Sequence, residues 1–309
     1  MTPTLTGSPV STKSPPPFSW ITISWVSALL ALCYAPVTAR LVNQWYDDPD
    51  MGHGFFVPVI AGYIAWQNRG RIAGLAPQPN WWGLAVMLWA AFQLYVGTLG
   101  AELFISRTSL VISIIGAVLL LGGTRYLRIF AFPLFLLFFM VPIPTVIYNS
   151  LTFPLQLRAS EMAEWAIGVL GIPIIREGNV LELASGKLNV VEACSGIRSL
   201  LTLTFLSLVY GYFAEKRIWV RVVLFFSTIP IAILANAGRV TLTGVVSDRI
   251  SPDLAEGGFH EAQGWVIFMV AFAILVVFHQ ALVRVVSPLE KRTLERRELE
   301  RRKNAVPAE

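Results

Sequence analysis

Long apolar runs recur along almost the whole chain, and they limit what it can fold into more than any other feature. Eight such runs, separated by short polar segments, occupy residues 20–37, 54–66, 81–97, 110–122, 129–148, 200–213, 218–234 and 265–286. Hydrophobic residues make up 55% of the 309 residues and charged residues only 14%, which is more apolar surface than a soluble domain of this length can bury. The sequence therefore predicts an all-α polytopic membrane protein with about eight transmembrane helices.

One segment departs from this pattern by carrying charges at regular steps. Residues 149–171 are otherwise apolar, but three charged side chains follow one another at every third position: Arg158, Glu161 and Glu164. This spacing places the charges along one helix face. It is typical of an amphipathic helix that lies at the membrane surface or packs against other helices, rather than of a membrane span.

Residues 174–192 contain the only convincing β-strand signal. Two strand-like stretches, residues 179–183 and 188–192, flank the sequence Ala-Ser-Gly-Lys at residues 184–187. Small and flexible residues between two such stretches are typical of a hairpin turn. We therefore predict a small extracytoplasmic β-hairpin.

The two ends of the chain differ in composition from its centre. Residues 1–17 are rich in Pro, Ser and Thr, which predicts a disordered N-terminal tail. Residues 289–309 are strongly charged and predict a cytoplasmic C-terminal tail. The part between them, residues 18–288, is predicted to be a single membrane-embedded domain.

Basic residues are distributed unequally between the two ends of the predicted spans. With the N-terminus inside and the amphipathic helix treated as non-spanning, sixteen of the 24 Lys and Arg residues fall on the cytoplasmic side. The other eight fall on the outer side: Arg40, Arg107, Arg158, Arg176, Lys187, Arg198, Arg239 and Arg249. Because short cytoplasmic loops carry an excess of basic residues, both termini are predicted to be cytoplasmic.

Cys194 lies where a polar loop meets the apolar run that starts at Leu200. A thiol at the water boundary can ionise, and the first turn of the following helix favours the anion. Arg198, four residues further on, shares a helix face with Cys194 and brings a fixed positive charge. The alternative is a small buried cysteine beside an arginine that reaches the interface. The other cysteine, Cys33, is predicted to be a packed small residue, although a disulfide with Cys194 stays open.

Two further segment ends on the predicted outer side carry residues of related chemistry. Arg239 follows the seventh apolar run, and His260 precedes the last one. Together with Cys194 they supply the groups of thiol acyl transfer: a nucleophile, a proton carrier, and a cation that stabilises the thiolate or the oxyanion. The alternatives are an arginine that anchors a helix at the interface and a histidine in a solvated loop.

The same segments resemble a known family. The sequences EACSGIRS (192–199), NAGR (236–239) and GGFH (257–260), in this order, are similar to those of the exosortase/archaeosortase family of membrane transpeptidases. The segments GHGFFVP (52–58) and VPIP (141–144) resemble the same family. The resemblance therefore extends from about the second apolar run to the last.

The resemblance implies a function and its residues. Cys194 matches the family's nucleophile, Arg239 its catalytic arginine and His260 its catalytic histidine. Arg198 and Asn236 lie in the matching motifs and are candidates either for assisting the thiolate or for a motif role that stays open. It implies a cysteine protease/transpeptidase in the bacterial inner membrane, with its active site facing the periplasm and without a cofactor or metal. The implied partners are membrane lipid and exported proteins with a C-terminal sorting signal, and not nucleic acid. That signal consists of a short motif (Pro-Glu-Pro in bacterial substrates), a transmembrane helix and a basic tail.

The residues alone leave two non-catalytic functions open. In a transporter or channel, polar residues would line a path within the spans, whereas here they lie mostly at the ends. In a scaffold for polysaccharide or protein export, Cys194 would be incidental. Three acidic residues and His53 either shape an outer vestibule or form a solvated loop; the acidic residues are Asp47, Asp48 and Asp50.

Overall fold

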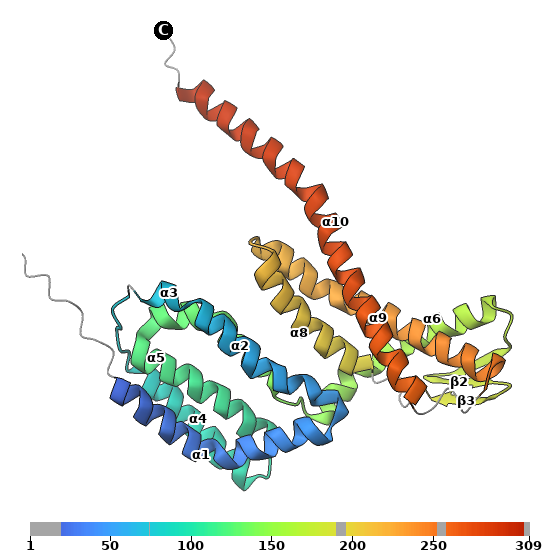
Figure 1. Cartoon of the computed structure of the whole chain (residues 1–309), viewed down its shortest axis with the longest axis horizontal. Helices are drawn as coiled ribbons and strands as arrows, with labels where there is room; N and C mark the ends of the chain where they lie inside the picture. The colour runs from blue at the N-terminus through green and yellow to red at the C-terminus, as the bar shows by residue number, and fades with distance from the viewer. Residues whose placement is uncertain (1–19, 74, 190–195, 252–257, 306–309) are drawn as a thin grey trace, which may run out of the picture. The chain divides into compact units, whose positions relative to one another are not determined.

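The chain forms two compact units, Met1–Pro144 and Thr145–Glu309, each built mostly from helices (Figure 1). The structure is a computed structural model that describes residues 20–73, 75–189, 196–251 and 258–305. The mostly helical architecture and its long apolar helices confirm the predicted polytopic helical fold. The predicted disordered tail lies outside the described residues, and the predicted domain boundaries stay a prediction.

Helical elements follow one another through the first unit with short connections. They are α1 (Trp20–Asp47), η1 (Pro49–Phe55), α2 (Phe56–Gln67), α3 (Arg69–Ile72), α4 (Trp82–Leu99), α5 (Leu103–Leu136) and η2 (Leu137–Met140), where η marks a 3-10 helix. Glycines allow α4 and α5 to pack closely: a Cβ atom at Gly83 would collide with the backbone of Leu120 and lie 2.6 Å from the carbonyl oxygen of Gly116. Facing glycines favour helix association in a membrane, where apolar burial contributes little.

α5 is bent at Gly123, which adopts a non-helical backbone conformation with φ 78° and ψ −171°. Side chains rarely tolerate this φ, and a Cβ atom here would also collide with the carbonyl oxygen of Gln78, so glycine is required. The helix continues on both sides of the bend. The predicted spans at residues 110–122 and 129–148 therefore correspond to two helical segments that meet at Gly123. Both segments contact α1: the Tyr34 hydroxyl donates to the carbonyl oxygen of Ser109, and the Trp45 indole donates to that of Met140.

The second of these two predicted spans also ends earlier than expected. α5 ends at Leu136, η2 extends to Met140, and residues 141–144 are not helical. Proline lacks a backbone N–H and restricts the residue before it, so the two prolines in this segment, at positions 142 and 144, prevent the helix from continuing.

Two segments that are distant in sequence meet in the first unit. The indole N–H of Trp45 donates a hydrogen bond to the carbonyl oxygen of Met140 over 2.9 Å, and Nε2 of His53 lies 3.2 Å from the carbonyl oxygen of Phe139. A Cβ atom at Gly54 would lie 2.5 Å from the Trp45 ring. His53 is only 8% exposed, and burial lowers the pKa of its imidazole. The interpretation of His53 as part of a solvated loop is therefore wrong.

The acidic residues that precede His53 begin a short helix rather than an irregular loop. Asp48 caps η1, and its Oδ1 accepts a hydrogen bond from the backbone N–H of Asp50 over 2.9 Å. An aspartate at this position satisfies a backbone donor that the first turn leaves without a partner. Asp48 therefore has a structural role.

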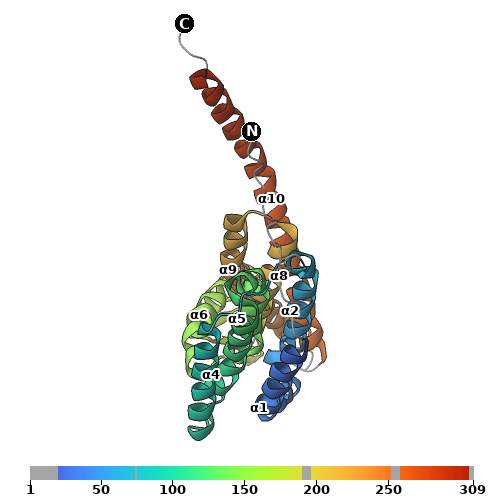
Figure 2. The ribbon, with the colours of Figure 1, turned by 90° about the vertical axis from the view of Figure 1, so that its left-hand side faces the viewer.

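The second unit combines long helices with a small sheet. Its elements are α6 (Thr145–Val169), β1 (Ile174–Glu177), β2 (Val180–Leu183), β3 (Gly186–Asn189), α8 (Gly196–Ala214), α9 (Ile218–Arg249) and α10 (Gly258–Ala305). α8 and α9 lie side by side, and the C-terminal half of α10 extends past the ends of both (Figures 1 and 2). The helix predicted over residues 149–171 is confirmed as α6, although it begins earlier.

The predicted hairpin is part of a three-stranded antiparallel sheet in the order β1-β2-β3. Leu183 pairs with Gly186, so the turn contains two residues rather than the predicted four. Glu182 pairs with Lys187 across the two strands, and their side chains form a salt bridge. β1 was not predicted as a strand of its own because residues 174–177 alternate only partly between apolar and charged side chains.

The sheet packs on α6 and α9 through buried apolar side chains. This core contains Ala163 and Ile167 of α6, Leu181 and Leu183 of β2, and Val240 of α9. A salt bridge of 2.6 Å between Arg176 of β1 and Glu164 of α6 adds to it. Because α9 is packed against this core, the sheet holds α9 at the level of Val240.

A polar cluster joins α8, α9 and α10 near the turn between α8 and α9. Oε1 of Glu215 accepts hydrogen bonds from the backbone N–H groups of Lys216 and Arg217 and from Nε of Arg217. His279 of α10 lies with Nε2 3.6 Å from Glu215 and with Nδ1 2.8 Å from the hydroxyl of Tyr210. Glu215 is 6% exposed, so this is a buried ion cluster that ties three helices together.

Five helices in the described part of the chain are long and apolar enough to cross a membrane: Trp20–Asp47, Trp82–Leu99, Leu103–Met140, Ile218–Arg249 and Ala262–Pro288. The predicted count of about eight is not confirmed. α2 has 12 residues, and the apolar part of α8 is Leu200–Ala214, so both are shorter than the ~20 residues that a bilayer requires. The third difference is α5, because the two predicted spans on either side of the non-helical Gly123 are counted together as Leu103–Met140.

Candidate active site

Arg239 lies inside α9, ten residues before this helix ends at Arg249. The helix therefore continues beyond the end of the seventh apolar run, whereas the position at which the chain leaves the membrane stays a prediction. Asn236, Arg239 and Thr243 are spaced three and four residues apart, so they share one face of a continuing helix. Asn236 is 8% exposed and Thr243 only 1%, which shows that this face is packed against neighbouring elements.

The guanidinium of Arg239 lies against Gly264 of α10. A Cβ atom at Gly264 would lie 3.3 Å from a terminal nitrogen and 3.4 Å from Cζ of Arg239. These distances are shorter than ordinary van der Waals contacts, so a side chain at this position would push the guanidinium away. The absence of a side chain at Gly264 therefore allows the Arg239 guanidinium to pack against α10.

Gln263 joins α10 to the backbone of α9 at the same level. Its Nε2 donates a hydrogen bond to the carbonyl oxygen of Arg239 over 3.0 Å, and its Oε1 accepts one from the Thr243 hydroxyl over 3.1 Å. Gln263 is 5% exposed, so both hydrogen bonds lie in a buried environment. Sequence analysis missed Gln263 and Thr243, because residues 236–263 were interpreted as a polar stretch rather than as two facing helices.

His260 lies in the first turn of α10, which begins at Gly258. It precedes Gly264 by four residues, so the two positions share a helix face. Because Arg239 contacts Gly264, Arg239 lies next to the face of α10 that also carries position 260. The side chain of His260 is outside the described part of the structure.

Cys194 lies outside the described residues. α8 begins at Gly196, two residues after it, and includes Arg198 in its first turn. Cys33, in contrast, is exposed on α1 of the first unit, so the prediction that it is packed is wrong. In the described residues, no group of three or more His, Cys, Asp or Glu residues could hold a metal ion.

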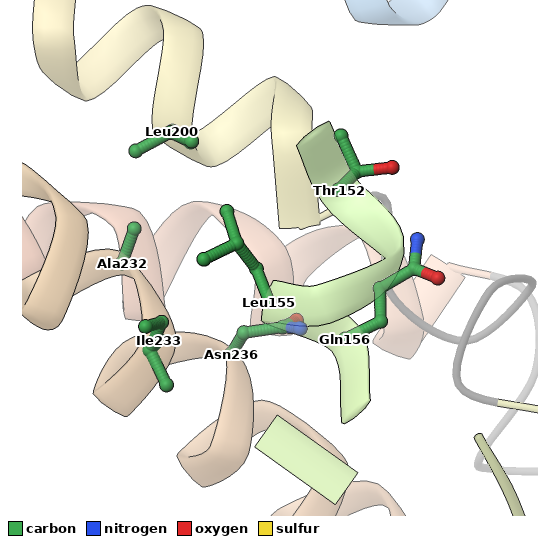
Figure 3. A pocket seen from close by; sticks show the side chains of 7 residues that line it. All are labelled: Thr152, Leu155, Gln156, Leu200, Ala232, Ile233 and Asn236. Carbon is green, nitrogen blue, oxygen red and sulfur yellow. The ribbon is translucent and has the colours of Figure 1, made fainter. Parts of the chain in front are cut away.

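Asn236 lines two small pockets of the second unit. We call the first the α6-side pocket; three helices line it (Figure 3), with Leu155 and Gln156 of α6, Leu200 of α8, and Ile233 and Asn236 of α9 among the lining residues. The second, the α10-side pocket, is lined by Leu203 of α8, Asn236 and Arg239 of α9, and Gly264 and Phe268 of α10, among others. Ala232 and Asn236 belong to both pockets. The face of α9 that carries Asn236 therefore connects an uncharged pocket to one that contains a guanidinium.

The family of the chain follows from a comparison with protein-family models. The model described as transmembrane exosortase matches residues 45–277. The chain belongs to the transmembrane exosortase family. Searches of the curated proteins and of the solved structures returned no match.

Family membership agrees with the organisation of this exosortase. The matched residues begin within α1, two residues before its end, and extend into α10. They include Cys194, Arg239 and His260 but not Cys33. Together with the five apolar helices, the match identifies the chain as a multi-pass membrane protein.

Proposed function

We propose that this exosortase is a cysteine protease/transpeptidase that removes the C-terminal sorting signals of exported membrane-anchored proteins through a thioester on Cys194. The observation that carries the proposal is the family match over residues 45–277, because this stretch includes the proposed nucleophile and both assisting residues. The substrate class is the one that the resemblance implies: a short motif such as Pro-Glu-Pro, a transmembrane helix and a basic tail.

The packing of the second unit supports this proposal. α9 packs against both α8 and α10. α8 begins two residues after Cys194, α9 carries Arg239, and α10 carries His260 in its first turn. The three elements that carry or adjoin the proposed catalytic residues are thus neighbours in one compact unit.

Each proposed residue has a step in the reaction. The thiolate of Cys194 attacks the carbonyl carbon of the scissile peptide bond and forms a tetrahedral intermediate, whose oxyanion accepts hydrogen bonds from Arg239. When the C–N bond breaks, His260 gives a proton to the leaving amine, and the acyl group remains on sulfur as a thioester. Water or an amine then attacks this thioester and loses a proton to His260, and Cys194 leaves as the thiolate, so that both residues return to their starting protonation states.

The unequal distribution of basic residues supports an active site on the periplasmic face of a bacterial inner membrane. Lys187 in β3 is well exposed and lies on the predicted outer side. An impermeant maleimide should therefore label Lys187→Cys in intact cells, in a Cys33→Ala background with Cys194 also replaced. Labelling only after the cells are opened would place this sheet in the cytoplasm and contradict the proposed orientation.

Processing of a reporter tests the proposed function. A tagged periplasmic protein with a Pro-Glu-Pro type sorting signal is co-expressed with the wild type, Cys194→Ala or Cys33→Ala. Loss of the reporter's C-terminal helix is expected with the wild type and with Cys33→Ala, and not with Cys194→Ala. Processing that is independent of Cys194 would contradict the proposal. It would favour the alternative of a non-catalytic transport or scaffold protein, with another protease acting on the reporter.

A further inference from the structure

Asn236 is a buried polar side chain in the wall of both pockets. More than nine-tenths of its surface is covered, and its carboxamide carries both donors and an acceptor. In Figure 3 the side chain points from α9 toward α6, into the α6-side pocket. A carboxamide that points into a pocket can donate hydrogen bonds to a bound group and accept them from it.

The other side chains of this pocket are uncharged. Leu155, Leu200 and Ile233 form apolar walls, and Thr152 and Gln156 lie at one side. The hydroxyl of Thr152 already donates a hydrogen bond to the carbonyl oxygen of Asn149 over 3.2 Å, and Gln156 points away from Asn236 in Figure 3. The pocket therefore offers a largely apolar surface into which the Asn236 carboxamide points.

We propose that the α6-side pocket holds one small, uncharged apolar residue of the sorting signal, with a peptide group of that residue hydrogen-bonded to Asn236. This inference rests on the proposed function, since it assigns a subsite for the same substrate. It makes Asn236 a binding residue for the substrate main chain.

The chemistry of the pocket favours this occupant over others. A carboxamide presents one acceptor and a donor side by side, which matches the C=O and N–H groups of an extended peptide. A peptide that leaves a transmembrane helix near the bilayer needs such partners, because its backbone groups are no longer satisfied within the helix. A charged residue would be desolvated here without a counter-charge, so it is disfavoured.

The position of the pocket relative to Arg239 indicates which substrate group lies beside the guanidinium. Asn236 and Ala232 line both pockets, so a residue in the α6-side pocket lies across one helix face from the guanidinium. A neighbouring substrate group with negative charge is expected on the Arg239 side. The α6-side pocket thus binds an uncharged residue of the peptide, and the α10-side pocket binds an adjacent group with negative charge.

A size exchange between pocket and substrate tests the proposal. In the reporter, residues around the cleavage site are changed one at a time to Ala, Val, Trp or Asp. One of these reporter positions should occupy the pocket. At that position, the wild-type enzyme should process the reporters with Trp or Asp at least tenfold more slowly than the reporter with Ala. Ile233→Ala removes part of the pocket wall, so it should process the Trp reporter at least tenfold faster than wild type does, while still rejecting Asp. A misfolded variant cannot produce this gain.

The matched control is Leu234→Ala on the next residue of the same helix. Leu234 is 53% exposed and does not line the pocket. The Leu234→Ala variant should therefore process the four reporters at the same relative rates as wild type. If Ile233→Ala and Leu234→Ala behave alike, or if Ile233→Ala changes all reporters equally, the pocket holds a lipid chain or packed protein and the inference is wrong.

Asn236→Leu separates binding of the main chain from activation of the thiol. It should raise KM for the Ala reporter at least tenfold with a smaller effect on kcat, because uniform binding is lost. Alkylation of Cys194 by iodoacetamide in a Cys33→Ala background should keep its rate. A slower alkylation with unchanged KM would instead give Asn236 a role beside the thiolate and overturn the inference.

The proposed function and this inference fail in different ways. If wild type processes no reporter, or does so without Cys194, both are wrong. If processing depends on Cys194 but no position shows the size exchange with Ile233→Ala, only the subsite is wrong.

Discussion

The guanidinium of Arg239 in α9 lies against the backbone of Gly264 in α10, and a Cβ atom at Gly264 would come within 3.3 Å of a guanidinium nitrogen. Position 260 lies one helical turn earlier on the same face of α10. A single glycine therefore sets how closely Arg239 approaches the helix that carries the proposed proton carrier. Gln263, beside Gly264, fixes the same two helices through the carbonyl oxygen of Arg239.

Gly264→Ala should displace the Arg239 guanidinium by a few tenths of an ångström. If this group stabilises the oxyanion, such a displacement weakens hydrogen bonds in the transition state and should lower kcat/KM of reporter processing by about tenfold. Gly168→Ala is the matched control, because a Cβ atom at Gly168 of α6 meets nothing within 4 Å. Equal activity of the two variants would show that the contact with Gly264 has no role in the reaction.

Arg239→Lys keeps the positive charge but loses the planar set of donors. A role in binding an oxyanion or carboxylate predicts a loss of about 100-fold in kcat/KM, which is the order found when an oxyanion donor is removed. A role as an interfacial anchor predicts almost full activity, since lysine also reaches the interface. Arg249→Lys, at the exposed end of the same helix, should process the reporter at the wild-type rate.

Glu215 should make stability depend on acid pH. Burial raises the pKa of its carboxyl, but hydrogen bonds from the Arg217 side chain and from the backbone N–H groups of Arg217 and Lys216 outweigh burial and lower the pKa to about 2. Because this pKa lies below the ordinary value of 4.5, the stabilisation is present above pH 4.5 and is lost as the pH falls toward 2. A shift of this size corresponds to at most about 3 kcal/mol.

Glu215→Gln should therefore lower the unfolding temperature in detergent at pH 7 and flatten its dependence on pH between 5 and 2. Glu161→Gln is the control, because the salt bridge between Glu161 and Arg158 is exposed on α6. An exposed pair of this kind contributes about 0.5 kcal/mol, so this variant should keep the wild-type pH profile. A Glu215→Gln profile that superimposes on wild type would contradict the role of the buried cluster.

Gly54→Ala and Gly52→Ala test the packing of the first unit. A Cβ atom at Gly54 would lie 2.5 Å from the Trp45 ring, whereas a Cβ atom at Gly52 meets nothing within 4 Å. Gly54→Ala should thus destabilise the protein by about 1–3 kcal/mol through overpacking. Gly52→Ala should change the free energy of unfolding by less than about 0.5 kcal/mol, so its thermal midpoint in detergent should equal that of wild type. Equal midpoints for the two variants would contradict this packing.

The sequence predicted the helical membrane fold and the small hairpin, because apolar runs and a turn between strand-like stretches are local signals. It did not predict that α9 continues past residue 234. Asn236, Arg239 and Thr243 look like a polar loop in a hydropathy pattern, yet their helical spacing was visible. The bend at Gly123 depends on a distant contact with Gln78, which no local pattern reveals.

The candidate site was predictable in its parts and not in its geometry. Cys194, Arg239 and His260 follow from the resemblance, and Arg239 follows also from its charge at an apolar run. Gln263 and Gly264 could not be predicted, because their importance comes from the packing of α10 on α9. A glutamine or a glycine by itself carries no chemical signal of such a role.

The central claim is that Cys194 forms a thioester with the substrate, and intact mass analysis of the protein after a short incubation with the reporter tests it most directly. The account predicts a wild-type species heavier by the mass of the acylating reporter fragment, attached at Cys194 and released by hydroxylamine, and no such species for Cys194→Ala. Processing of the reporter at the wild-type rate by Cys194→Ala, or an adduct on another residue, would contradict it.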